Sequence, residues 1–264
     1  MKSYRYVILD PTGNLTALVT EPADKADEAE LTRALLEKSE QVAYLEPPVR
    51  PEAAARIRLM GGEFCGNAAM ASAAWLLRNE PYPGMEKALL LEVSGAAEPV
   101  LCTVRRTAEG YEGTVEMPGV PEIDTETLCG IPFTAVRMEG ITHLICEDRT
   151  FRPAEAEKLL REIAEKRQEE AIGLLQWNRE TRRMTPLVWV RGSGSLVWEH
   201  GCGSGSAAVG AAEALRKNGG KTVTEVIQPG GMITVTAVAE DKIIRSVSIC
   251  GKVRLGTETT VEVS

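Results

Sequence analysis

The sequence predicts an α+β protein built from two related halves. Short alternating apolar runs bounded by glycine and proline predict strands, and two alanine-rich stretches, 65–79 and 202–219, predict helices. Each stretch opens with Cys-Gly followed by Asn or Ser, and each precedes another strand-like run. A unit that occurs twice indicates a duplicated fold, which we expect to form two pseudo-symmetric domains with a cleft between them.

The other elements follow from hydrophobic spacing. Two charged stretches with spaced apolar positions predict amphipathic helices at 24–38 and 154–170. The expected strands are 4–9, 15–19, 42–45, 56–59, 88–93, 100–105, 113–117 and 222–227. We place the first domain at 1–120, with 251–264 as a candidate strand returning to it, and the second domain at 121–250.

Composition restricts the partners. The 264 residues carry a formal net charge of −8, and lysine and arginine are scattered, which argues against nucleic acid and favours a small soluble substrate. No apolar run approaches the roughly 20 residues that span a bilayer. The apolar run near the N-terminus ends after four residues, which is too short for a signal peptide, so we expect no membrane contact and a cytoplasmic location. There the six cysteines should be reduced, and their spacing with only two histidines gives little support for a metal site.

Two cysteines at helix starts suit proton transfer at the α-carbon of an amino acid. Such a reaction builds a carbanion beside a carboxylate, and without a pyridoxal cofactor the site must stabilise this charge electrostatically. The free N–H groups at a helix N-terminus favour a carboxylate. Those groups would come here from two pairs of residues, Gly66 with Asn67 and Gly203 with Ser204.

Inversion also requires proton exchange on both faces of that carbon. Cys65 and Cys202 would serve as opposed base and acid, since a helix N-terminus lowers the pKa of a thiol from about 8.5 toward neutrality. A single cysteine in an alanine-rich helix is more often a small buried hydrophobe. Recurrence of both at the same place in a repeat favours catalysis, whereas the other four cysteines lack the motif: Cys102, Cys129, Cys146 and Cys250.

At these motifs the sequence resembles the diaminopimelate epimerase-like fold family. That family pairs C-G-N in one half with C-G-[ST]-G in the other, and further matches are SGAAEPV, MPG and QPGG. Within it, the closest similarity is to the histidine racemases of staphylopine-type metallophore biosynthesis, through DPTGNLTALV, GEFCGNA, EQV and SLVWEHGCGSG. The resemblance implies strand-rich domains around central helices, an isomerase active without cofactor or metal, and assembly as a homodimer.

The resemblance also assigns residues. Cys65 and Cys202 match the two bases, and the binding positions for the reacting carboxylate match Gly66, Asn67, Gly203 and Ser204. Asn14 matches an asparagine that lines the substrate site. Gln41 and the preceding Glu40 lie where the family places pocket residues, although a solvated charge is an equal alternative for Glu40.

Two departures bear on the substrate. The family's G-N-P-H segment reads GITH at 140–143, with Ile141 in place of asparagine, and the expected Glu-Arg-Gly reads Val-Arg-Gly at 190–192. The lost polar groups hold the distal charges of diaminopimelate, so that substrate is disfavoured and histidine leads by resemblance. Diaminopimelate epimerase remains the alternative.

Other interpretations stay open. The glycine-rich start of 202–219 faintly imitates a dinucleotide-binding turn, which would make the chain an oxidoreductase, but its spacing is G-x-G-x-G rather than G-x-G-x-x-G. A binding protein without catalysis is a second alternative. We expect 228–231 to be a turn rather than a cleft lining, His143 to pack in or beside a strand, and His200 to lie in an exposed loop or to tune Cys202.

Overall fold

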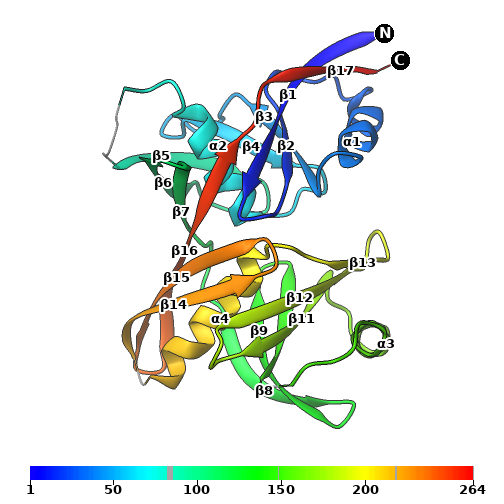
Figure 1. Ribbon diagram of the computed structural model, residues 1–264, viewed down its shortest axis with the longest axis vertical. Helices are drawn as coiled ribbons and strands as arrows, with labels where there is room; N and C mark the ends of the chain where they lie inside the picture. Colours follow the sequence, from blue (N-terminus) through cyan, green and yellow to red (C-terminus); the bar gives the residue numbers. More distant parts are fainter. Residues whose placement is uncertain (82–85, 148, 218, 264) are drawn as a thin grey trace. The chain divides into compact units, whose positions relative to one another are not determined.

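The computed structural model describes residues 1–81, 86–147, 149–217 and 219–263. The chain forms two compact units, which are described separately (Figure 1). The first unit holds 1–118 and 250–264, and the second holds 119–249. The chain passes from the first to the second after Pro118 and returns within strand β16 (Ile243–Leu255), whose residues from Cys250 onward belong to the first unit.

The first unit combines two helices with a mixed sheet. Its elements are β1 (Lys2–Pro11), β2 (Thr16–Val19), α1 (Glu28–Leu36), β3 (Gln41–Glu46), β4 (Ala55–Leu59), α2 (Gly66–Leu76), β5 (Glu86–Val93), β6 (Val100–Thr107), β7 (Gly110–Glu116) and β17 (Thr259–Val263). β1 pairs antiparallel with β2, with β17 and with the end of β16. Two pairs are parallel: α1 connects β2 to β3, and α2 connects β4 to β5. The remaining pairs, β3–β4, β5–β6 and β6–β7, are antiparallel.

The second unit repeats this order of pairings. Its elements are β8 (Glu122–Leu128), β9 (Ile131–Met138), β10 (Ile141–Glu147), α3 (Pro153–Glu165), β11 (Ala171–Asn178), β12 (Arg183–Val190), β13 (Ser195–Trp198), α4 (Gly203–Arg216), β14 (Gly220–Gln228) and β15 (Gly231–Glu240). β9 and β10 are antiparallel, α3 connects the parallel pair β10–β11, and α4 precedes β14, which lies parallel to β12. β11–β12 and β14–β15 are antiparallel. The duplication therefore extends beyond the cysteine motifs to the whole unit.

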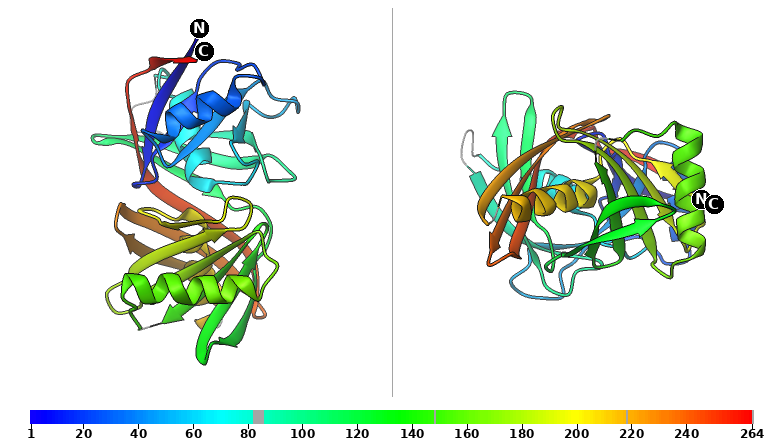
Figure 2. Two further views of the ribbon diagram at one scale, coloured as in Figure 1. Left: turned by 90° about the vertical axis from the view of Figure 1, so that its right-hand side faces the viewer. Right: turned by 90° about the horizontal axis from the view of Figure 1, so that it is seen from below.

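A helix of small residues lies in the interior of each unit. Ten of the eleven residues of α2 are buried against β1 and β4–β7, and α4 packs against β9–β11, β14 and β15 (Figure 2, right). Glycine permits this close approach, because a Cβ on Gly113 would lie 2.8 Å from Met70 and one on Gly210 would lie 2.3 Å from Val235. Among the helices described, none has the length and apolarity needed to cross a membrane.

The other two helices cover the outer faces of the sheets. α3 shares a core with Leu144 and Leu174, whereas their strand neighbours His143 and Gly173 face α4. β10 and β11 are thus covered on both faces, which accounts for their nearly continuous burial. α1 packs in the same way on a core that includes Tyr6 and Val42.

Both outer helices are shorter than the amphipathic patterns predict. α1 begins at Glu28 rather than at residue 24, because Asp24 and Asp27 are held in a turn by the ammonium of Lys2. α3 ends at Glu165 rather than at residue 170. Beyond it, the guanidinium of Arg167 forms ion pairs with Glu126 and Glu169. These contacts hold residues 166–170 in a conformation that does not continue the helix.

Candidate active site

The two cysteines of the repeated motif cap the two interior helices. Cys65 has an extended backbone (φ −135°, ψ 109°), and its Sγ accepts a hydrogen bond from the backbone N–H of Ala68 at 3.5 Å. Cys202 has φ −104° and ψ 106°, and its Sγ accepts from the N–H of Gly205 at 3.3 Å. Each sulfur therefore lies at the positive end of a helix and receives the third N–H after it, as an N-cap does.

Polar side chains from β2, β3 and the turn before β2 surround Cys65. Gln41 Nε2 lies 3.3 Å from Cys65 Sγ, 2.7 Å from Asn14 Oδ1 and 2.8 Å from Thr16 Oγ1. The Thr16 hydroxyl donates in turn to the carbonyl of Asn14 at 3.1 Å. An amide nitrogen has two hydrogens, so Gln41 serves two of these three acceptors at a time. The amide is held in place whether or not it donates to the sulfur.

This arrangement accommodates both protonation states of Cys65. A thiolate accepts from Gln41 and from Ala68, while a thiol can donate to Asn14 Oδ1, 4.0 Å away. The carboxylate of Glu40 accepts from Asn14 Nδ2 at 2.9 Å, which turns Oδ1 toward the sulfur. Glu40 is therefore connected to Cys65 through one intervening side chain, that of Asn14, and is not simply a solvated charge.

Cys202 lies in a tighter environment. The residue is 5% exposed, and its backbone N–H donates to Gln228 Oε1 at 2.7 Å. Gln228 Nε2 donates to Ser206 Oγ at 2.8 Å, and the Ser206 hydroxyl donates to the Cys202 carbonyl at 2.7 Å. The sequence predicts only a turn at 228–231. β15 does begin directly after that turn, but the Gln228 side chain points inward and fixes the backbone at Cys202.

The electrostatics of Cys202 favour the thiol, so the lowered pKa that its place at a helix start predicts is not found for this cysteine. Burial and the carboxylate of Glu199 raise the pKa of Cys202 well above its ordinary value, and the Ser204 hydroxyl and Gly205 N–H oppose this rise. Ser204 Oγ is 3.6 Å from the sulfur. The sequence motifs do not predict this role for Glu199, although an acid three residues before the cysteine is the signal that could indicate it.

His143 is a second residue whose contact the sequence does not reveal. It is fully buried in β10, and its Nε2 lies 2.9 Å from Ser204 Oγ. Burial lowers the pKa of His143 to about 3, so the imidazole is neutral near pH 7. The prediction that it packs within a strand describes its place but misses this link to the Cys202 motif. His200 lies exposed in the loop before Cys202.

The residues expected to bind a carboxylate occupy the first turn of each helix. Gly66 and Asn67 are the first two residues of α2, and Gly203 and Ser204 are the first two of α4. N–H groups at these positions have no acceptor within their own helix, so each helix start can bind an anion. Among the described residues, no group of three or more His, Cys, Asp or Glu side chains could hold a metal ion.

The remaining cysteines lie in other surroundings. Cys102 and Cys146 are buried in β6 and β10, and burial raises the pKa of both, that of Cys102 to about 12. Cys129 is exposed in the turn between β8 and β9, and Cys250 lies in β16. None of these four caps a helix of the described structure.

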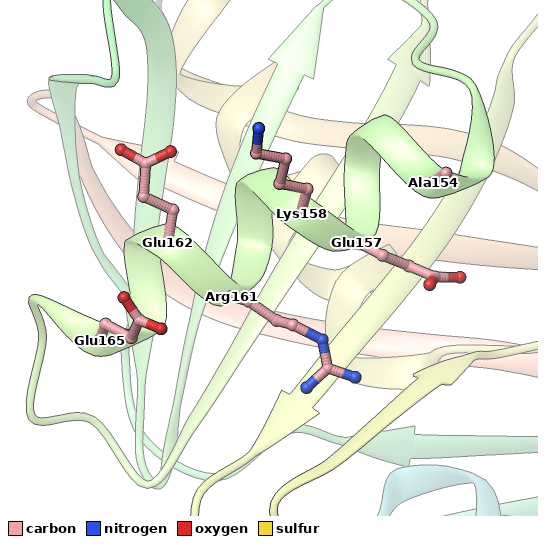
Figure 3. A pocket seen from close by; sticks show the side chains of 6 residues that line it. All are labelled: Ala154, Glu157, Lys158, Arg161, Glu162 and Glu165. Atoms are coloured by element: carbon pink, nitrogen blue, oxygen red, sulfur yellow. The ribbon is translucent and has the colours of Figure 1, made fainter.

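A hollow on the outer face of α3 has no catalytic character (Figure 3). Its side chains project in different directions from the helix and include neither cysteine nor histidine. Lys158, Arg161, Glu157 and Glu162 instead form a solvated face of mixed charge.

Comparison with known proteins assigns the chain to a family. The family model described as the histidine racemase CntK N-terminal domain matches residues 3–261. The chain belongs to this histidine racemase CntK family. The resemblance predicted from the paired motifs is thus confirmed, and the chain is an isomerase of the racemase and epimerase class.

Individual relatives of this CntK family member agree. A histidine racemase from Staphylococcus aureus (strain Mu50) is 28% identical over 268 residues, covering 92% of each chain. Among solved structures, a predicted epimerase from Pseudomonas aeruginosa superposes with a TM-score of 0.70 at 22% identity, covering 99% of this chain and 100% of that one. A probable proline racemase from Agrobacterium radiobacter K84, with bound carbonate, gives 0.76 at 14% identity, with coverages of 99% and 93%. These two structures support the α+β fold predicted from the sequence.

Proposed function

We propose that this protein interconverts L- and D-histidine, with Cys65 and Cys202 as the two acid–base groups. The observation that carries the proposal is the matched placement of the two sulfurs, each capping an interior helix of one repeat. Membership of the histidine racemase CntK family supports histidine as the substrate. It also favours the racemase over the dinucleotide-binding alternative.

The reaction follows from the chemistry of the thiols. The thiolate of one cysteine removes the α-proton and becomes a thiol, leaving its electron pair on the α-carbon beside the carboxylate. The other cysteine, initially a thiol, donates its proton to the opposite face and becomes a thiolate. The two sulfurs thus exchange states in each turnover, and the reverse reaction uses them in reverse order. This mechanism requires both to reach one carbon from opposite sides.

Other residues of the two helix starts would bind the substrate. The first-turn N–H groups of Gly66, Asn67, Gly203 and Ser204 would hold the carboxylate and stabilise the charge that develops on it. Asn14 and Gln41 orient the Cys65 side, and Glu40 is the group we assign to the imidazole or amine of the substrate. Because the mechanism needs free thiols, we propose that the protein works in a reducing compartment, the cytoplasm.

Solvent exchange tests the proposal directly. The purified protein is incubated in D₂O, without added pyridoxal phosphate or metal, with histidine, diaminopimelate, proline and the other common amino acids in turn. We expect histidine to gain one mass unit and lose its optical rotation. Exchange confined to diaminopimelate would establish the epimerase alternative. Silence across the panel, with a melting temperature that rises on addition of NAD(P), would instead favour the oxidoreductase.

A further inference from the structure

Three side chains of the second unit form a connected chain that ends at Cys202. His143 Nε2 lies 2.9 Å from Ser204 Oγ, and Ser204 Oγ lies 3.6 Å from Cys202 Sγ. His143 and Ser204 are 61 residues apart, and β10 packs directly on α4. Which atom donates and which accepts in each of these hydrogen bonds depends on which nitrogen of the neutral imidazole carries the proton.

The surroundings of His143 decide that question. Its Nδ1 is buried and has no hydrogen-bond partner in the described residues. The ring lies across Gly173, its pairing partner in β11, where a Cβ would come within 2.2 Å of Nδ1. Nδ1 therefore faces a backbone carbon that offers no acceptor. A buried N–H without an acceptor is costly, whereas a proton on Nε2 has Ser204 Oγ to bind.

We propose that His143 is a positioning residue that fixes a one-way chain of hydrogen bonds onto Cys202. His143 Nε2–H donates to Ser204 Oγ, and the single hydroxyl hydrogen of Ser204 is then left to point at Cys202 Sγ. Ser204 becomes an obligatory donor to the sulfur. The backbone N–H of Gly205 supplies a second donor from the helix.

These hydrogen bonds would stabilise the Cys202 thiolate during racemisation. This role rests on the function proposed above. Burial and Glu199 disfavour the Cys202 thiolate, yet the thiolate must form once in every turnover. A fixed donor stabilises it without bringing a charge that would trap it. Cys65 receives the equivalent donor from the neutral amide of Gln41. Each sulfur is thus paired with one uncharged donor side chain of its own unit.

The tautomer can be observed by NMR whether or not the protein is a racemase. The chain has two histidines, so ¹⁵N-histidine labelling gives two ring systems, and the variant His200→Gln assigns them. We expect His143 to show the Nε2–H tautomer and no titration between about pH 5 and 8. An Nδ1–H tautomer, or a protonated ring in that range, would overturn the proposal.

Alkylation of Cys202 measures the effect on the thiol. Its rate with iodoacetamide is followed against pH by peptide mass, with Cys65 in the same sample as the internal reference. In His143→Leu we expect Cys202 to react about tenfold more slowly near pH 8, which corresponds to one pKa unit. His143→Gln keeps an N–H near Nε2 and should recover most of the rate, while Cys65 should not change in either variant.

Three results contradict the proposal: an unchanged Cys202 rate, a faster one, or an equal change at both cysteines. If His143→Leu does not fold, His143→Gln and the tautomer still decide. A protein with the expected tautomer and rates but without α-proton exchange would keep the hydrogen-bond chain and refute only the proposed function.

Discussion

Cys65 and Cys202 cap their helices in the same way, with sulfurs 3.5 Å and 3.3 Å from the third backbone N–H of the following helix. Their surroundings differ. Cys65 is partly exposed and receives the amide of Gln41, whereas Cys202 is buried next to Glu199 and Ser204. A duplicated backbone thus holds two chemically unequal thiols, and we expect Cys202 to be protonated at rest.

Replacing either thiol by a hydroxyl should stop the reaction and preserve the fold. In Cys65→Ser and Cys202→Ser we expect α-proton exchange with histidine to fall by at least about a hundredfold, because a hydroxyl is a far weaker acid. Serine is itself a preferred N-cap, so the melting temperature should change little. The exposed Cys129→Ser serves as the control and should keep its activity. Full activity in either capping variant would remove that cysteine from the mechanism.

Gln228 should contribute to stability as well as to the site. In Gln228→Leu the Cys202 N–H and the Ser206 hydroxyl each lose a buried partner, which should lower the free energy of unfolding by about 1–3 kcal/mol. Exchange activity should fall too, because the backbone at Cys202 is released. Urea unfolding measures the first effect, with the exposed Val223→Ala on the same strand as control. An equal loss in both variants would contradict a specific role.

Local patterns were sufficient for the elements that carry the cysteines. Small residues over 65–79 and 202–219 predict the interior helices, and the Cys-Gly pairs predict where these helices begin. Both predictions succeed because the residues that carry each signal lie within a few positions of one another. The repeat was visible only at these motifs. The pairings β1–β2 and β9–β10 correspond in the structure without sharing a sequence motif, so periodicity could not align them.

Contacts between residues that are far apart along the chain could not be predicted from local sequence patterns. Gln41 contacts Cys65, 24 residues further along the chain, and Gln228 contacts the backbone of Cys202, 26 residues before it. Both contacts depend on how the strands pair and on how the helices connect them. The family resemblance supplied Gln41, but nothing local distinguishes Gln228 from an ordinary residue before a Pro-Gly-Gly turn. His143 likewise looks like any strand residue until β10 is set against α4.

Close packing of α4 should make Gly210 intolerant of a side chain. In Gly210→Ala the new Cβ would meet Val235, so we expect a loss of about 1–3 kcal/mol in the free energy of unfolding despite the better helix propensity of alanine. Gly192→Ala is the matched control, since a Cβ there meets nothing within 4 Å. Adding Val235→Ala should recover part of the loss. A Gly210→Ala protein as stable as the parent would show that the helix can move away from β15.

Acid should destabilise the fold through His143. The pKa of this buried ring falls from 6.5 to about 3, so between these values the unfolded chain binds a proton that the folded chain does not. The free energy of unfolding must therefore decrease as the pH is lowered through this window, by up to about 5 kcal/mol in total. Replacing His143 by glutamine removes the group that takes up this proton. The stability of His143→Gln relative to the parent should rise steadily from pH 6.5 toward pH 3, as measured by urea unfolding at each pH. The exposed Val223→Ala, which changes no titratable group, should differ from the parent by the same amount at every pH. A constant difference between the parent and His143→Gln across the window would mean that the ring is not held neutral in the folded protein.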